Sequence, residues 1–584
     1  MKQVVQEISS GNTIVLDVPV PSPQPGMALV RTAASLVSVG TERALVEFAG
    51  KSLLGKARSR PDLVKQVIEK VQREGLLTTF DAVQNRLDQP LPLGYASAGT
   101  IVAVGNGLEG YEVGDRVACA GGGFAVHAEY ALVPKNLLAK LPDEVTFEQG
   151  AVTTLGAIAL HGFRLGGVGV RDRVAVIGLG LLGLLAAQIA RTAGCAVFGI
   201  DVDRARVERA RSLGIEACER EVAEGAGSSF TAGHGFDLVQ ICADTASNDT
   251  VELAGILARN KGVIVSTGVV GLELPRKLYF EKELQFVVSR SYGPGRYDPA
   301  YEQGGQDYPY GYVRWTEGRN LEAFVELLAE GKVAVDGLLT HRYPIEQAAA
   351  AYDFISDPDE DFIGVLLTYS QGDDDGEAVE TYIQIRSKTA KSDAQLNLGV
   401  IGAGNFATAV LFPQMKKISG LNWVGLATAT GLSSGHAGRR YGFQYATSDV
   451  DRLLKDEQIN TIVVLTRHHL HAEQVSKALS AGKHVFCEKP LAVDPETLEL
   501  VVQALASAEG LLTVGFNRRF APLAVQLKEQ FTAVKDPLMM QYRVNAGALP
   551  ADHWLHDPEQ GGGRIIGEAC HFIDFLTFIA GQPP

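Results

Sequence analysis

The chain has 584 residues, 46% hydrophobic and 64 of them glycine, and at roughly 100–200 residues per domain it predicts three to five α/β domains. Lysine and arginine number 53 against 68 acidic residues, and the net charge of −15 argues against nucleic acid or an anionic membrane as a partner. Six cysteines are scattered without a C-x-x-C pair, so we expect no disulfide framework and a reducing, cytoplasmic compartment.

No segment predicts secretion or membrane insertion. The start, MKQVVQEISSGN, lacks a basic stretch followed by an apolar one, which predicts no signal peptide. The uncharged run VAVIGLGLLGLLAAQIA at 174–190 is slightly short for a span, and its glycine spacing has a better explanation below.

Residues 1–150 predict an all-β, barrel-like domain, because short β-rich stretches alternate with Gly/Pro punctuation. A return strand near 345–369 (GVLLTY) is expected to rejoin it. A helical insertion at 61–75 carries an apolar stripe that packs on the barrel or on a partner subunit, or serves as a substrate lid. The stripe consists of Leu63, Val64, Val67, Ile68 and Val71.

Residues 151–344 predict a parallel, doubly wound Rossmann domain that binds NAD. Gly178-x-Gly180-x-x-Gly183 follows the strand RVAVI and opens a helix, and Leu181 and Leu182 belong to the same turn. Such a turn lets the backbone approach a pyrophosphate at the helix N-terminus. Asp201 ends the second strand, where a carboxylate accepts hydrogen bonds from ribose hydroxyls and repels a 2′-phosphate.

A polar, acid-rich linker at 370–395 separates this half from a second Rossmann domain at 396–518. The second cradle reads Gly402-x-Gly404-x-x-Ala407, with Asn405 and Phe406 inside it, and alanine is an accepted third member. Its second strand ends near Thr428 without an acid, so NAD and NADP both stay open.

Residues 519–584 predict an incomplete α+β substrate domain. LMMQYRVNAG at 538–547 is typical of a strand, and GEACHFIDFLTFIAG of a helix. One strand cannot form a stable sheet alone, so the chain is either a fragment or is completed by a partner.

Residues 1–369 resemble the medium-chain dehydrogenase/reductase family, on the motifs PLGYASAGTIVAVG (92–105), GDRV (114–117) and HAEY (127–130). The resemblance implies a GroES-like barrel before the Rossmann domain. Zinc members carry cysteine, histidine and glutamate where this chain has Val39, Tyr95 and Ala96. These side chains cannot replace zinc ligands, so we predict no metal and no zinc. Tyr95 then serves as a catalytic hydrogen-bond donor, or as a core aromatic that fills the vacated pocket.

Residues 396–584 resemble the Gfo/Idh/MocA oxidoreductases, on GAGNFA, TRHHLHAEQVSKAL, GKHVFCEKPLA, VGFNRRFAP and GGGRIIGEACHFID. The resemblance implies that Lys489 lies by nicotinamide and substrate, and that His571 is the acid/base. It also places Thr466 and Glu488 in the cofactor site. The family often has an aspartate where Gly567 stands here, with Glu568 adjacent, so this acid/base arrangement is altered.

Four further polar side chains of the second half have two interpretations each. His468 and His471 lie where a strand meets a helix, and contact substrate or only shape the loop. Arg519 binds an anionic substrate or an internal carboxylate. Asp574 contacts substrate or holds its helix.

The fusion order resembles bi-domain oxidoreductases of bacterial polysaccharide and sugar metabolism. In the first half, the stretch at 279–320 is rich in aromatic residues and arginines and includes Arg296. Such a stretch can stack on a sugar or bind a carboxylate or phosphate. The alternative is an ordinary surface or a dimer interface.

The sequence therefore predicts a metal-free NAD(P)-dependent oxidoreductase with two dinucleotide sites, acting on a CH–OH group of a sugar or nucleotide-linked sugar. One speculative extension is a relay, in which one half oxidises and the other reduces. The alternatives are a single working half with the other as scaffold, and a non-enzymatic NAD-responsive binding protein. Self-association stays open.

Overall fold

The computed structural model divides the chain into two compact units, described here one at a time. The first unit comprises Met1–Leu16, Pro23–Arg73 and Leu87–Glu377, and the second Asp17–Ser22, Glu74–Arg86 and Ala378–Pro584. The structure describes residues 1–52, 87–357, 359–371, 380–387, 396–532, 538–550 and 553–581, and positions 55, 56, 58, 64, 65, 67, 83, 534 and 536. The helix expected at 61–75 lies largely outside the described residues.

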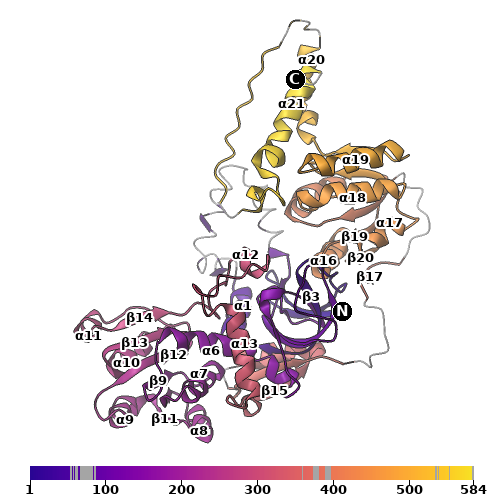
Figure 1. Ribbon diagram of the computed structural model, residues 1–584. Helices are drawn as coiled ribbons and strands as arrows, with labels where there is room; N and C mark the ends of the chain where they lie inside the picture. Colours follow the sequence, from indigo (N-terminus) through magenta and orange to yellow (C-terminus); the bar gives the residue numbers. More distant parts are fainter. Residues whose placement is uncertain are drawn as a thin grey trace. The chain divides into compact units, whose positions relative to one another are not determined.

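A seven-stranded sheet with the order β15-β16-β3-β5-β6-β8, in which β7 also pairs with β3, forms the barrel part of the first unit (Figure 1). β16 pairs antiparallel with β3, so the chain returns to its first sheet as the sequence predicts. A small sheet β2-β1-β4 and the helices α1 and α14 accompany it. The elements are β1 (Lys2–Gln6), β2 (Thr13–Asp17), β3 (Met27–Val37), α1 (Val39–Gly50), β4 (Leu91–Pro92), β5 (Ala96–Val104), β6 (Arg116–Ala120), β7 (Tyr130–Pro134), β8 (Leu138–Lys140), β15 (Leu339–Pro344), α14 (Ala348–Ser356) and β16 (Gly364–Thr368).

The rest of the first unit is a doubly wound parallel sheet with the order β11-β10-β9-β12-β13-β14 (Figure 1). This order reverses direction between β9 and β12, and the crevice at such a switch point is where dinucleotides bind. The apolar strands are buried under the helices, as a parallel sheet requires. The elements are β9 (Arg173–Ile177), α7 (Leu181–Thr192), β10 (Ala196–Asp201), α8 (Arg204–Ser212), β11 (Glu216–Glu219), α9 (Ala223–Phe230), β12 (Phe236–Ile241), α10 (Asp249–Leu257), β13 (Ala258–Ser266), α11 (Arg276–Glu281) and β14 (Gln285–Val288), with α6 (Thr153–Leu165) before them and α13 (Glu317–Ala329) after them.

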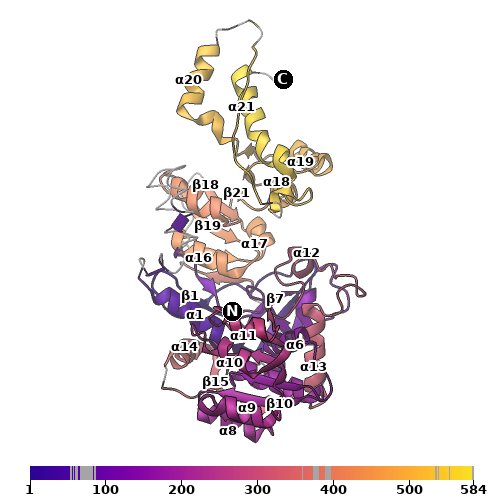
Figure 2. The ribbon, with the colours of Figure 1, turned by 90° about the vertical axis from the view of Figure 1, so that its left-hand side faces the viewer.

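The second unit repeats this winding, with the order β17-β20-β19-β18-β21-β22-β23. Only its edge strand β17 runs antiparallel to its neighbour. Helices α18 and α19 lie side by side (Figure 2). The elements are β17 (Tyr382–Gln384), β18 (Leu396–Ile401), the π-helix η5 (Ala407–Leu411), α15 (Phe412–Met415), β19 (Leu421–Ala427), α16 (Gly431–Tyr441), β20 (Tyr445–Thr447), α17 (Val450–Lys455), β21 (Thr461–Val464), α18 (His468–Ser480), β22 (His484–Cys487), α19 (Pro495–Ser507) and β23 (Leu512–Val514).

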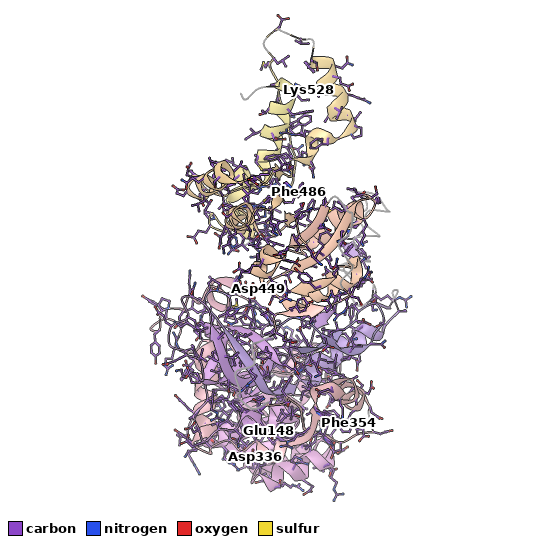
Figure 3. The ribbon with its side chains drawn as sticks, turned by 90° about the vertical axis from the view of Figure 1, so that its right-hand side faces the viewer. Glu148, Asp336, Phe354, Asp449, Phe486 and Lys528 are labelled. Atoms are coloured by element: carbon purple, nitrogen blue, oxygen red, sulfur yellow. The ribbon has the colours of Figure 1, made fainter. Side chains whose placement is uncertain are left out.

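After β23 the second unit consists of helices and irregular chain. The elements are η6 (Asn517–Phe520), α20 (Pro522–Phe531), the π-helix η8 (Ile565–Ala569) and α21 (Cys570–Ala580). Lys528, labelled in Figure 3, donates from Nζ to the carbonyl of Ile579 at 3.1 Å and ties α20 to α21. The strand expected at 538–547 is wrong: this stretch is irregular, because no described strand is available to pair with it.

A short proline-rich strap from the N-terminal region, Asp17–Ser22, belongs to the second unit. Val20 donates its N–H to the carbonyl of Glu380 at 3.0 Å, and Ser22 donates its hydroxyl to the carbonyl of Ser448 at 2.6 Å. A side chain at Gly431 would lie 1.7 Å from the carbonyl oxygen of Pro19, so α16 begins directly against the strap. The expectation of one barrel over 1–150 did not include this excursion.

The strap is expected to contribute to the stability of the second unit. Val18 and Val20 are 0% and 2% exposed, so replacing either with alanine should lower the unit's free energy of unfolding by about 2 kcal/mol. Hydrogen exchange of peptides spanning α16 and β20 measures the change. Val113→Ala, at a side chain 63% exposed in the first unit, is the matched control and should leave that exchange unaltered. Equal exchange in the strap and control variants would contradict a structural role for the strap.

Candidate active sites

The first glycine cradle lies between β9 and α7 and leaves room for a ligand at one place. Gly178 has φ +93°, and a Cβ there would lie 2.7 Å from the backbone nitrogen of Ala243. A Cβ at Gly183 would lie 1.8 Å from the carbonyl oxygen of Gly178, so helix and strand approach too closely for any side chain. At Gly180 a Cβ would meet only Arg206, at 4.0 Å, and this is the open side that a pyrophosphate needs. Leu181 and Leu182 form the first turn of α7 behind it.

Asp201 is fixed at the end of β10 beside this cradle. Its Oδ2 accepts the N–H of Leu179 at 2.5 Å, and its Oδ1 accepts the N–H of Asp203 at 2.9 Å. The carboxylate is 6% exposed. Each carboxylate oxygen retains a second acceptor site, so both ribose hydroxyls can still be bound. The residues of the cradle fit NAD.

The second cradle has the same design with a different helix start. Gly402 has φ +102°, and a Cβ there would lie 2.6 Å from the carbonyl oxygen of Leu465. A Cβ at Gly404 would meet nothing within 4 Å. Ala407 is buried at the start of η5, with Phe406 as its N-cap and Asn405 before it. The Cβ of Ala407 is accommodated where the helix opens as a wider π turn.

Lys489 and His571 meet at the carboxyl edge of the second sheet. Lys489 follows β22 and donates from Nζ to the carbonyl of Gly567 at 2.7 Å. One turn further along, His571 lies at the start of α21, 9% exposed, and its Nδ1 has no hydrogen-bond partner among the described residues. The ammonium keeps two further hydrogens for a ligand, and the imidazole keeps a free nitrogen. These are the two groups that the resemblance implied.

His571 is neutral at physiological pH in this environment. Burial, together with the Lys489 and Arg518 charges, lowers the pKa of its imidazole to about 4, while Asp574 acts against this shift. A neutral imidazole is the form that accepts a proton. Glu488, one residue before the lysine, has its carboxyl pKa raised by burial, and a side chain at Gly515 would lie 2.7 Å from its Oε1.

His471 has no ring nitrogen left for a substrate. Its Nδ1 lies 2.7 Å from the carbonyl oxygen of Pro490 and its Nε2 lies 3.1 Å from that of Thr466. The side chain is 1% exposed. Of the two interpretations, these contacts favour loop shaping, because the residue holds the turn after Lys489 against the loop that follows β21.

His468 faces the same region from the start of α18. Its Nδ1 lies 2.9 Å from the carbonyl oxygen of Gly561, and burial lowers the pKa of its imidazole to about 4. A Cβ on Gly567 would lie 3.0 Å from His468 Cε1 and 2.5 Å from Leu555 Cδ1. A side chain at this position would therefore require Leu555 and His468 to shift.

Arg519 and Asp574 bind each other. The guanidinium donates from Nε to Asp574 Oδ2 at 3.0 Å, and a second, shorter bond from the same guanidinium reaches Oδ1. The pair joins η6 to α21, the helix that carries His571. Of the open interpretations, this pair favours an internal carboxylate for Arg519 and a helix-holding role for Asp574.

In the first half, the positions of the family's zinc ligands hold no donor set. Val39 begins α1, Ala96 begins β5, and Tyr95 donates its hydroxyl to Ser38 Oγ at 2.5 Å. A valine, an alanine and a phenol do not fit zinc. Within the described ranges, no three histidine, cysteine or acidic side chains come together in a way that could hold a metal ion.

Arg296 is already engaged within the protein. Its guanidinium forms an ion pair with Glu302 and lies 4.1 Å from the ring centre of Tyr297. Close by, burial raises the pKa of the Glu317 carboxyl to about 9, while Arg296 acts against this rise. The charge of Arg296 is therefore compensated within the protein, and its role in binding a substrate stays a prediction.

A buried polar cluster beneath Tyr95 was missed in the sequence. It joins Ser35, Ser38, Glu42, His127, Tyr352 and Tyr369. Glu42 and His127 are 1% and 0% exposed. The only sequence signal was the presence of these polar side chains: Glu42 follows Val39 in SVGTER, and His127 opens HAEY.

Known families match three segments of the chain. Residues 67–143 match the alcohol dehydrogenase GroES-like domain, residues 182–303 the zinc-binding dehydrogenases, and residues 396–516 an oxidoreductase family with an NAD-binding Rossmann fold. These matches confirm the predicted order of the domains. The segment matched to the zinc-binding dehydrogenases contains none of Val39, Tyr95 and Ala96.

Several dehydrogenases are similar to parts of the chain. The D-xylulose reductase of Scheffersomyces stipitis is 26% identical over 46% of this chain and 80% of its own length. The levoglucosan dehydrogenase of Pseudarthrobacter phenanthrenivorans is 30% identical over 27% of this chain and 42% of its own. The galactitol-1-phosphate dehydrogenase structure from Escherichia coli, 22% identical, covers 63% of this chain and 100% of its own, with a TM-score of 0.49. No helix within the described ranges is long and apolar enough to span a membrane.

Removing the Lys489 charge should raise the pKa of His571. The ammonium is the second cause of its low value after burial, so in Lys489→Met the imidazole should titrate above pH 4, closer to its ordinary 6.5. NMR titration of the ring protons measures this. Lys477→Met, at a side chain 53% exposed on α18, is the control. An unshifted His571 titration in Lys489→Met would show that the two groups do not interact.

Proposed function

We propose that this NAD(P)-dependent oxidoreductase acts without a metal on a CH–OH group of a sugar or sugar derivative. Its first half is similar to alcohol dehydrogenases, and its second half to oxidoreductases with an NAD-binding Rossmann fold. The proposal includes two dinucleotide sites. Lys489 Nζ, 2.7 Å from the Gly567 carbonyl oxygen, and the unpartnered His571 Nδ1 are the observation that carries it. The D-xylulose reductase and levoglucosan dehydrogenase similarities support a sugar or polyol as the substrate.

Lys489 and His571 divide the work of alcohol oxidation in the second half. The ammonium donates a hydrogen bond to the substrate oxygen and stabilises the negative charge that develops there. The neutral imidazole accepts the hydroxyl proton. A bound nicotinamide supplies the acceptor for the hydride that leaves the same carbon, so a C=O bond replaces C–OH. Arg519 and Asp574 keep α21, and with it the imidazole, in place.

The two halves are expected to differ in how strongly they discriminate NAD from NADP. Asp201 favours NAD in the first half, because a carboxylate repels a 2′-phosphate. In the second half, hydroxyls stand at the corresponding strand end: Thr428 Oγ1 donates to the carbonyl of Thr430 at 2.6 Å. Hydroxyl side chains can hydrogen-bond to a ribose hydroxyl or to a 2′-phosphate, so NAD and NADP both fit.

All six cysteines are free thiols, which supports a reducing cytoplasm.

Two working dinucleotide sites predict two independent binding events. Gly180→Ala and Gly404→Ala each place a methyl group in the open side of one cradle, where it meets little or no protein. Each variant should keep the parent's thermal stability and lose roughly 10-fold or more in affinity at one site only. Calorimetric titration of the intact chain with NAD and with NADP counts the sites.

The double variant should bind neither cofactor with the parent's affinity. A parent that binds a single dinucleotide would identify one half as a scaffold, and the silent glycine variant would say which. A parent that binds two but oxidises none of a polyol panel would favour the NAD-responsive binding protein instead.

A further inference from the structure

The hydroxyls of Tyr95 and Ser38 lie beside the first dinucleotide cradle. A Cβ on Gly40, two residues after Ser38, would lie 3.3 Å from Asp244 Oδ2. The residue before Asp244 is Ala243, and a Cβ on Gly178 of the cradle would lie 2.7 Å from its backbone nitrogen. The start of α1 therefore faces the carboxyl end of β12, the edge of the sheet where the cofactor's reactive end belongs.

The direction of the hydrogen bond leaves Ser38 with a free hydrogen. Tyr95 donates to Ser38 Oγ at 2.5 Å, so this bond uses a lone pair of the serine. None of the described residues accepts the serine's own hydrogen. A hydroxyl that accepts one hydrogen bond becomes a stronger donor of the next.

Below the serine, Glu42 fixes the backbone that carries it. The carboxylate accepts the N–H of Ser38 on Oε1 at 3.1 Å, and Tyr352 and His127 bond to Oε2, the imidazole Nε2 at 3.1 Å. A carboxylate buried to this degree is stable only with such partners, because an unpaired buried charge is strongly destabilising. Three separate segments of the chain thus converge on one carboxylate.

The other side of the imidazole reaches the return strand. His127 Nδ1 lies 2.7 Å from Ser35 Oγ, which lies 2.7 Å from the hydroxyl of Tyr369. Gly94 has φ +94°, and a Cβ there would lie 2.6 Å from the backbone nitrogen of His127 and 2.8 Å from Cγ of its ring. The backbone just before Tyr95 is therefore pressed directly onto the imidazole, so the cluster fixes both members of the hydroxyl pair.

We propose that Ser38 is the hydrogen-bond donor to the substrate oxygen in the first half, in place of a Lewis acid, and that Tyr95, Glu42 and His127 position it. The proposal rests on the proposed function. Ser38 stabilises the negative charge that develops on that oxygen, while the hydride goes to bound NAD and the hydroxyl proton is released to solvent water. Tyr95 strengthens Ser38 as a donor, and neither side chain loses a proton. Burial raises the pKa of the Tyr95 phenol, which keeps it a donor through the neutral range.

The test uses the intact chain with Lys489→Met, which silences the second half, and D-sorbitol or xylitol with NAD as probes. Ser38→Ala should lower kcat by roughly 10²–10³-fold, the loss expected for one oxyanion donor. Ser38→Thr keeps the hydroxyl and should keep most of the rate. Tyr95→Phe should lower kcat about 10-fold, since only the assisting bond is lost. NADH fluorescence should show unchanged cofactor affinity in all three.

Glu42→Gln and His127→Gln test whether these residues position Ser38 or only stabilise the fold. Both should lower kcat with little change in KM for the polyol. Tyr279→Phe, at a buried tyrosine outside the cluster whose hydroxyl donates to the Val251 carbonyl at 2.8 Å, should lower the melting temperature and leave kcat near that of the Lys489→Met parent. Full activity of Ser38→Ala, or equal kcat losses in Tyr279→Phe and Ser38→Ala, would overturn the assignment while leaving the proposed function standing. A parent chain that turns over neither polyol, with Lys489 intact or replaced, would overturn both.

Discussion

The close approach of a strand and a helix at each glycine turn is the constraint on which both halves depend. In the first half, a single carbon atom added at Gly183 would overlap the carbonyl oxygen of Gly178. Because helix and strand lie this close, the N–H groups of the turn point into open space instead of into protein. The second cradle shares the tight strand end at Gly402 and the open side at Gly404, but Ala407 replaces the third glycine and the helix begins with a π turn.

In the mechanism we propose, the two halves stabilise developing charge by different means. The second half would use a cation, Lys489, next to an imidazole made neutral by burial. The first half would use a chain of neutral hydroxyls, whose geometry depends on the hydrogen bonds of Glu42 beneath them. A neutral donor is weaker than a metal ion, but it needs no ligand set and is fixed before the substrate arrives. The same enzyme therefore offers a charged and an uncharged solution to one chemical problem.

Much of the fold follows from local patterns, while much of the polar chemistry does not. Both cradles, their flanking strands and the order of the domains follow from glycine spacing and apolar runs, and Lys489 with His571 from ordered motifs. The partners of Arg519, Arg296 and His471 could not be inferred, because each is chosen by the fold and not by neighbours in the sequence. The strand expected at 538–547 failed for a related reason: its residues suit a sheet, but a strand needs a neighbour that composition does not supply.

The strap at Asp17–Ser22 also bears on how the protein is made. Ser22 and its partner Ser448 are 426 positions apart. At about 5–20 residues per second, a ribosome needs roughly 20–85 seconds to pass from one to the other. During that interval Val18 and Val20 have no place to bury, and the first strands fold around a segment whose partner has not been synthesised. The nascent chain must hold this segment open, which makes it a natural position for a chaperone to bind during translation.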